Sequence, residues 1–154
     1  MDTVAAAGGW MCDRVLGGWL VRVIVTGPSD VLALHVLGVQ AITFTQYLQS
    51  HPEQPTALAL DSAALDDDRV LENAYGALTH DTELTVWGEI ACAGVEDHPE
   101  PVMYRPSKAA AMFKAHALAL IEHAESAVDQ TERFRSCGLS YPPHGADLIP
   151  APLH

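Results

Sequence analysis

The chain has 154 residues and a formal net charge of −12, from 20 acidic and 8 basic residues. This acidity disfavours binding to nucleic acids and to anionic lipid surfaces, because like charges repel. Hydrophobic residues make up 49% of the chain, which is enough for a folded core and argues against general disorder.

The placement of charges and cysteines predicts a cytoplasmic protein. We expect no secretory signal, because no Lys or Arg precedes an apolar segment at the amino terminus. No window approaches the roughly 18 apolar residues of a membrane-spanning helix. The cysteines, Cys12, Cys92 and Cys137, are odd in number and never form a CxxC motif. Scattered thiols of this kind are typical of a reducing compartment.

The first element is predicted to be a helix that Asp2 or Thr3 caps and that runs to about Leu16. Gly8 and Gly9 would each weaken it by roughly 1 kcal/mol relative to alanine. Such a pair indicates the close approach of another element. Gly17 and Gly18 are expected to end the helix. The tryptophans of the two GGW triplets, at residues 8–10 and 17–19, are assigned to packing rather than to a ligand cage.

Residues 20–38 form the segment around which the fold is predicted. A run of β-branched residues favours a strand buried on both faces, Gly27 and Pro28 break it, and a helix follows up to Gly38. Strand, turn and helix in this order begin a βαβ unit. We therefore expect a single α/β domain over residues 1–138, Rossmann-like, with a mostly parallel sheet of about four strands flanked by helices. The other strands are predicted at residues 39–44, 56–61 and 82–88.

Acidic residues accompany the third predicted strand. The run 56–61 fits strand and helix alike, and we assign it to a strand. Asp66, Asp67 and Asp68 are predicted to begin a helix rather than to bind magnesium, because carboxylates suit the positive end of the helix dipole. Asp61 invites comparison with the phospho-acceptor of response-regulator receivers. The acidic pair and the lysine that receivers need are missing, so we reject that function.

A long helix is predicted from Ser107 to about Arg135, and Gly138 would stop it. Such a helix of about 28 residues would extend about 42 Å, more than a domain of this size can cover. Part of its apolar stripe should therefore bind a second copy or a protein partner. The residues proposed for this contact are Phe113, Leu120, Ala124 and Val128. The proline-rich tail, 139–154, should be extended and ordered only where it docks.

An alternative function rests on the turn after the first predicted strand. Backbone N–H groups of Thr26, Gly27 and Ser29 could hold a small anionic or nucleotide-like ligand at the following helix, as in an enzyme or a sensor. The segment carries neither a GxGxxG nor a GxxxxGK[ST] motif. Asp30 places negative charge where a phosphate would bind. A plain turn is the preferred interpretation.

No motif specifies catalysis or metal binding. His116 and His123 would lie about 10.5 Å apart along a helix, too far to share one ion. HExxH and GxSxG are absent from the sequence. A Cys–His nucleophile pair stays open, because such partners meet in space rather than in sequence. We predict no metal, no cofactor and no catalytic residue.

Three strings, GGWMCDRVLGGWLVRV, TVWGE and KAAAMFKAHALAL, resemble those of a group of small α/β proteins of high-GC actinobacteria. The resemblance covers most of residues 8–120. It implies a cytoplasmic α/β protein and brings no activity or site residues with it. We therefore expect a non-catalytic interaction protein, with the anion-binding enzyme or sensor as the alternative.

Overall fold

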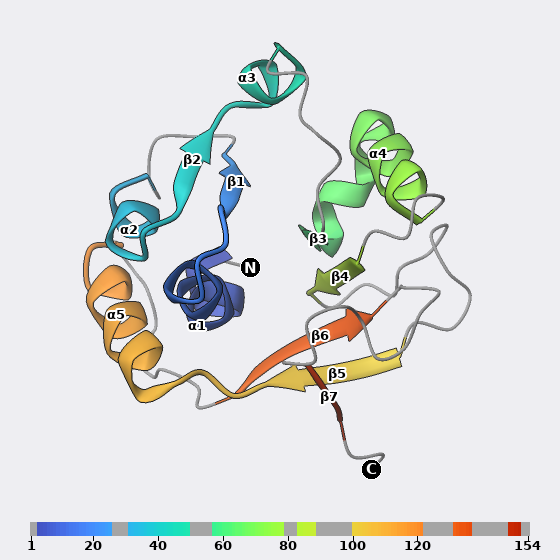
Figure 1. Cartoon of the computed structure of the whole chain (residues 1–154). Helices are drawn as coiled ribbons and strands as arrows, with labels where there is room; N and C mark the ends of the chain where they lie inside the picture. The colour runs from blue at the N-terminus through green and yellow to red at the C-terminus, as the bar shows by residue number, and fades with distance from the viewer. Residues whose placement is uncertain are drawn as a thin grey trace. The chain divides into compact units, whose positions relative to one another are not determined.

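The computed structural model describes residues 3–25, 31–49, 57–78, 83–88, 100–121, 131–136 and 148–151 (Figure 1). The chain divides into two compact units. The first combines Met1–Pro52 with Arg105–Glu132, and the second combines Glu53–Tyr104 with Arg133–His154. Each unit is thus built from two separate stretches of the chain.

The first unit is mainly helical and contains a small parallel sheet. Helices α1, α2 and α5 pack against one another. Strands β1 and β2 pair in parallel, with Arg22 opposite Gln40 and Ile24 opposite Ile42. The described elements of this unit are α1 (Thr3–Leu16), β1 (Arg22–Ile24), α2 (Val31–Val36), β2 (Gln40–Ile42), α3 (Phe44–Gln49) and α5 (Lys108–Leu118).

Glycines end α1 and α2, as the sequence predicts. Gly18 and Gly38 have positive φ angles of 89° and 75°. After α1, the N–H of Trp19 donates to the carbonyl of Arg14, and the N–H of Gly18 donates to the carbonyl of Val15. This pair of bonds is a Schellman motif, which satisfies carbonyls that the helix itself leaves unbonded. Both helices therefore carry their stop signal in the local sequence.

The second unit is built on a five-stranded sheet of order β3-β4-β6-β5-β7. Strands β3 and β4 are parallel, whereas the pairs β4–β6 and β5–β7 are antiparallel. The elements around this sheet are β3 (Ala57–Asp61), η1 (Ser62–Asp66), α4 (Asp68–Leu78), β4 (Glu83–Trp87), β5 (Glu100–Tyr104), β6 (Glu132–Ser136) and β7 (Ile149–Pro150). Glu132, the first residue of β6, belongs to the first unit.

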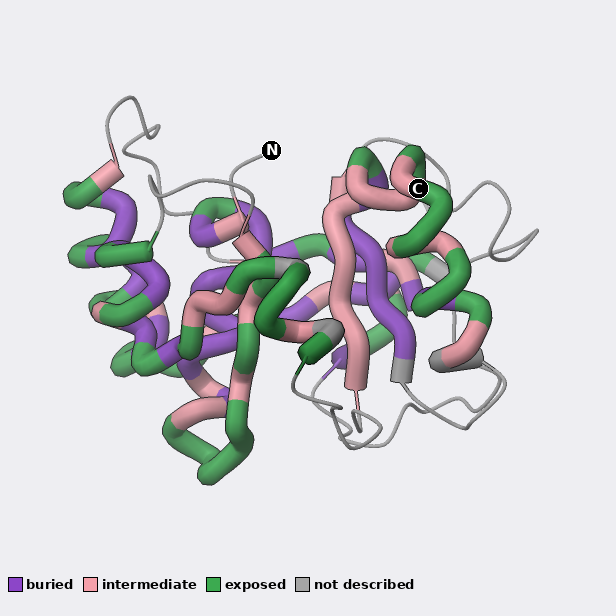
Figure 2. Tube along the Cα trace, turned by 90° about the horizontal axis from the view of Figure 1, so that it is seen from above, coloured by how far each residue is buried: buried purple, intermediate pink, exposed green. Residues whose placement is uncertain are grey.

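The core of the second unit lies between β4 and α4. Leu84 and Val86 alternate along β4 and are buried with Ala74 of α4. Leucines of β3, η1 and α4 pack against this cluster, namely Leu58, Leu60, Leu65 and Leu71. Figure 2 shows β4 as a buried purple segment beside β3, which is partly exposed and drawn in pink. Period-two alternation of apolar residues thus gives this strand, as the sequence predicts.

The predicted mostly parallel sheet is wrong. The second sheet is mixed, because β6 and β7 run antiparallel to their neighbours β4 and β5. The predicted central strand is shorter than expected and is not buried on both faces. In β1, Arg22 is exposed and Ile24 is 39% exposed. β-branched residues identified a strand here without telling how much of it would be covered.

The predicted long helix is also wrong. Helix α5 ends at Leu118, and residues 132–136 form β6 instead of the last turn of a helix. Strong local helix preference and an apolar stripe were outweighed by contacts distant in sequence. The extended conformation predicted for the tail is confirmed where β7 docks on β5. Pro150 there lies opposite Val102, and the N–H of Ala151 donates to the carbonyl of Pro101.

Among the described helices, none combines the length and the hydropathy needed to cross a membrane.

Candidate functional site

The predicted anion site lies outside the described residues. Thr26, Gly27 and Ser29 fall between β1 and α2, which are the strand and the helix expected on either side. Helix α2 has only six residues, so its dipole would be weak. Anion binding at this turn stays a prediction.

The predicted interaction stripe does not form one continuous face. Phe113 is 43% exposed on α5, and Leu120, just beyond the end of the helix, is 48% exposed. Ala117, which follows Phe113 at helical spacing, is buried, and Phe134 is buried in β6. Ala124 and Val128 lie outside the described residues. The stripe was predicted with helical spacing from Ser107 to about Arg135, but α5 ends at Leu118 and residues 132–136 form β6, so Phe113 and Phe134 lie on different elements.

Helix α5 is nevertheless two-faced. Its buried positions, Ala110, Lys114, Ala117 and Leu118, follow helical spacing and define the side that is packed within the first unit. Met112, Phe113 and Leu120 form what we name the α5 outer face, where Met112 is 66% exposed. No Asp or Glu occurs from residue 101 to residue 121. In a strongly acidic chain, this face lies in a segment free of carboxylates, and the exposed His116 lies one turn after its apolar residues Met112 and Phe113.

A buried ion pair lies on the packed side of α5. Lys114 Nζ donates to Glu132 Oε1 at 2.6 Å, and each side chain is only 1% exposed. Sequence reasoning missed this pair. A signal was present, because Lys114 occupies an apolar position of the helix, four residues after Ala110 and three before Ala117. A lysine at such a position needs a buried partner.

The carboxylate of Glu132 also binds the backbone of α1. The N–H of Gly9 donates to Oε1 at 2.7 Å, and the N–H of Trp10 donates to Oε2 at 2.8 Å. A Cβ on Gly9 would lie 3.1 Å from Oε1 and 2.7 Å from Cβ of Pro106. The close approach predicted from the Gly8-Gly9 pair is thereby confirmed at Gly9. We name Lys114, Glu132 and the amides of Gly9 and Trp10 the Glu132 clasp.

Burial dominates the electrostatics of this region. It raises the pKa of Glu132, although the Lys114 ammonium and the two α1 amides act in the opposite direction. Burial also raises the pKa of the nearby Cys12 thiol, and the negative charges of Asp13 and Glu132 raise it further. A thiol in such surroundings stays protonated and is a poor nucleophile. Cys12 is therefore unsuited to a Cys–His pair, whereas Cys92 and Cys137 lie outside the described residues.

Near the carboxyl end of α1, the guanidinium of Arg14 contacts two tryptophan rings. The guanidinium carbon of Arg14 lies 4.2 Å from the ring centre of Trp10 and 4.5 Å from that of Trp19. Trp10 is buried, and Trp19 is partly exposed. Stacking of this kind stabilises a buried guanidinium by cation–π attraction. The tryptophans of the two GGW triplets thus both contact the same arginine of the chain.

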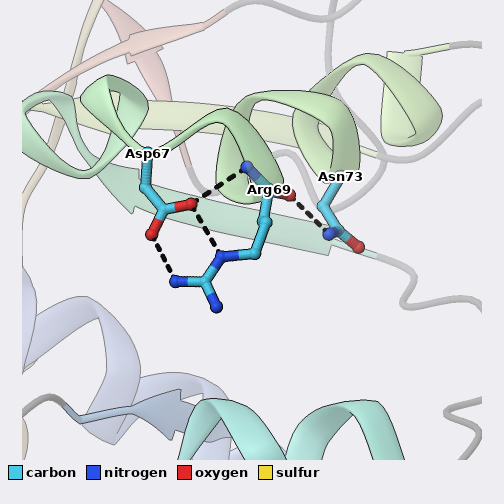
Figure 3. A network of polar contacts seen from close by, with 3 residues as sticks. All are labelled: Asp67, Arg69 and Asn73. Carbon is cyan, nitrogen blue, oxygen red and sulfur yellow. Dashed lines mark hydrogen bonds and ion pairs between the residues drawn. The ribbon is translucent and has the colours of Figure 1, made fainter.

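The acidic run begins α4, as predicted, and Figure 3 shows its polar contacts. Asp67 Oδ1 accepts the N–H of Arg69 at 2.9 Å, which caps the helix. The guanidinium of Arg69 also donates to both carboxylate oxygens of Asp67. These bonds lower the pKa of Asp67 to about 2. Asn73 Nδ2 donates to the carbonyl of Arg69, one turn earlier.

Asp61 also has a capping role, since its side chain accepts the N–H of Ala63 at the start of η1. Across the ranges that the structure describes, no three His, Cys, Asp or Glu residues gather closely enough to hold a metal ion. Comparison of the chain with protein-family models, with curated proteins and with solved structures finds no match.

Proposed function

We propose that this chain is a non-catalytic interaction protein that associates through the α5 outer face, and that its partner is a second copy of the chain. The observation that carries this proposal is the exposure of Met112, Phe113 and Leu120, while the opposite side of the same helix is buried. Exposed apolar clusters on a folded unit are typical of protein contacts.

Charge favours the second copy as partner. Two chains of net charge −12 repel each other, so a stable contact must keep their carboxylates apart. The segment from residue 101 to residue 121 has none, and a symmetric contact would bring this same face of both copies together. We also propose a cytoplasmic location, supported by the scattered cysteines. The resemblance of three sequence strings to those of small actinobacterial proteins agrees with this proposed location.

The test is the oligomeric mass of the purified chain, measured by native mass spectrometry over a range of concentrations. We expect a dimer for the wild type and a monomer for Phe113→Glu, because a carboxylate on each face would repel its counterpart. Leu20→Glu is the matched control, since Leu20 is 70% exposed and lies between α1 and β1, outside α5. It should keep the wild-type mass. A wild-type chain that is monomeric at every concentration contradicts the proposal.

A further inference from the structure

Helix α5 ends without the stop signal that α1 and α2 carry. Its capping residue Ala119 is right-handed, with φ −64° and ψ −15°. The next amides, of Leu120 and Ile121, donate to carbonyls three residues earlier at 3.1 Å. Neither glycine nor proline occurs between Pro106 and Gly138. The local sequence therefore contains no residue that forces the helix to end at Leu118.

The sequence after α5 favours a helix, yet residues 132–136 form a strand. Most of residues 119–135 are of types with good helix propensity, including alanine, leucine, glutamate and arginine. In the structure, Arg135 and Ser136 lie opposite Val86 and Thr85 of β4. A contact between residues far apart in sequence must therefore overcome the local preference.

The Glu132 clasp is incompatible with one continuous helix. Lys114 and Glu132 are separated by 18 residues. On a single helix they would lie about 27 Å apart along the axis. Their side-chain atoms instead meet at 2.6 Å, fully buried. The ion pair can form only when residues 114 and 132 do not belong to one helix, and burying Lys114 without its partner would leave an uncompensated charge.

We propose that the Glu132 clasp is a conformational device that selects the strand at residues 132–136. Lys114 and the amides of Gly9 and Trp10 capture the carboxylate and hold the start of β6 in place. A chain that lacks this capture lets residues 132–136 return to the helical conformation that their sequence favours. The device is independent of association through the α5 outer face, because Lys114 lies on the opposite side of the helix.

The test compares backbone secondary chemical shifts at residues 132–136 in the wild type and in Lys114→Met/Glu132→Lys. Methionine fills the space of the lysine stem without charge, and lysine resembles glutamate in helix propensity but cannot accept hydrogen bonds from α1. We expect the shifts to change from strand-like to helical. Arg133→Glu, at the neighbouring exposed position, is the matched control and should keep strand-like shifts. Strand-like or coil shifts in the folded double variant would overturn the proposal.

A second measurement uses the unaltered chain, in case the double variant does not fold. If the clasp holds β6, the amides of Gly9 and Trp10 and those of Phe134 and Arg135 should become exchangeable in one opening event. Native-state hydrogen exchange should then give these amides equal opening free energies. A difference of more than tenfold in their protection would overturn the proposal.

Discussion

Two ion pairs of the same chain show how burial changes what a salt bridge does. Asp67 and Arg69 meet at 2.6 Å with side chains that are 42% and 67% exposed. Lys114 and Glu132 meet at the same distance with 1% exposure on each side. The exposed pair of Asp67 and Arg69 lies at the start of α4, where water can hydrogen-bond to either side chain if the other is removed. In the buried pair no water is available, so each charge depends on the other.

The largest difference between the two pairs should appear when one partner is removed. Glu132→Ala leaves the buried Lys114 ammonium without its carboxylate partner, so we expect a loss of about 3–5 kcal/mol in the free energy of unfolding. Denaturant titration followed by circular dichroism measures this loss. Arg69→Met in the exposed pair should leave the denaturation midpoint almost unchanged. Equal losses for both variants would contradict the role assigned to burial.

Substitution of Gly9, which contacts Glu132, should cause a smaller loss in the free energy of unfolding. Gly9→Ala places a Cβ against Pro106 and close to Glu132 Oε1, and we expect a loss of about 1–3 kcal/mol from this overpacking. Gly76→Ala is the matched control in α4, where a Cβ would meet nothing within 4 Å. That variant should gain up to about 1 kcal/mol from helix propensity. Thermal unfolding of both variants tests the difference, and a stable Gly9→Ala protein would show that the approach of Pro106 can relax.

The smallest effect is a pH dependence of opposite sign in the two pairs. Because the pKa of Asp67 falls from 3.8 to about 2 on folding, its contribution to stability is present above pH 4 and disappears as the pH falls towards 2. The pKa of Glu132 is raised above its ordinary 4.5, so the folded state binds its proton more readily. Its contribution is therefore present below pH 4.5 and is lost as the pH rises through the folded pKa.

Stability measured against pH for the wild type, Asp67→Asn and Glu132→Gln separates these contributions. Nuclear magnetic resonance titration of the Asp67 carboxyl should give a midpoint of about 2. An ordinary midpoint for Asp67, or slopes of the same sign for both carboxylates, would contradict this prediction.

The sequence predicted helix ends, helix caps and two strands correctly, because residues close by in the chain determine these features. Gly18 and Gly38 end helices, Ser107 caps α5 by accepting the N–H of Ala110, and the acidic run begins α4. Residues 57–61 and 83–87 are strands because their apolar residues suit a pleated surface. The presence of these elements depends mainly on residues within one turn or one strand.

Non-local contacts account for what the sequence did not reveal. The segment 132–136 was predicted to be helical, but it is a strand that pairs with β4 and β5, and Glu132 at its start binds Lys114. The antiparallel neighbours of β4 and β5 come from residues about 50 positions later, which no local pattern announces. The exposed apolar residues of α5 were partly foreseen. Phe113 and Leu120 are exposed, but Met112 was missed because it did not fit the stripe drawn through a longer helix.

The interleaving of the two units has a consequence for cutting the chain. Each unit draws on an early and a late stretch, with crossings after Pro52, Tyr104 and Glu132. A single cleavage after Tyr104 would give two fragments, neither of which contains a whole unit. The amino-terminal fragment would lack α5 and the carboxylate that binds α1, and the other would lack β3 and β4. Folding should therefore require both fragments in the same tube, as in a split protein that is reconstituted from its halves.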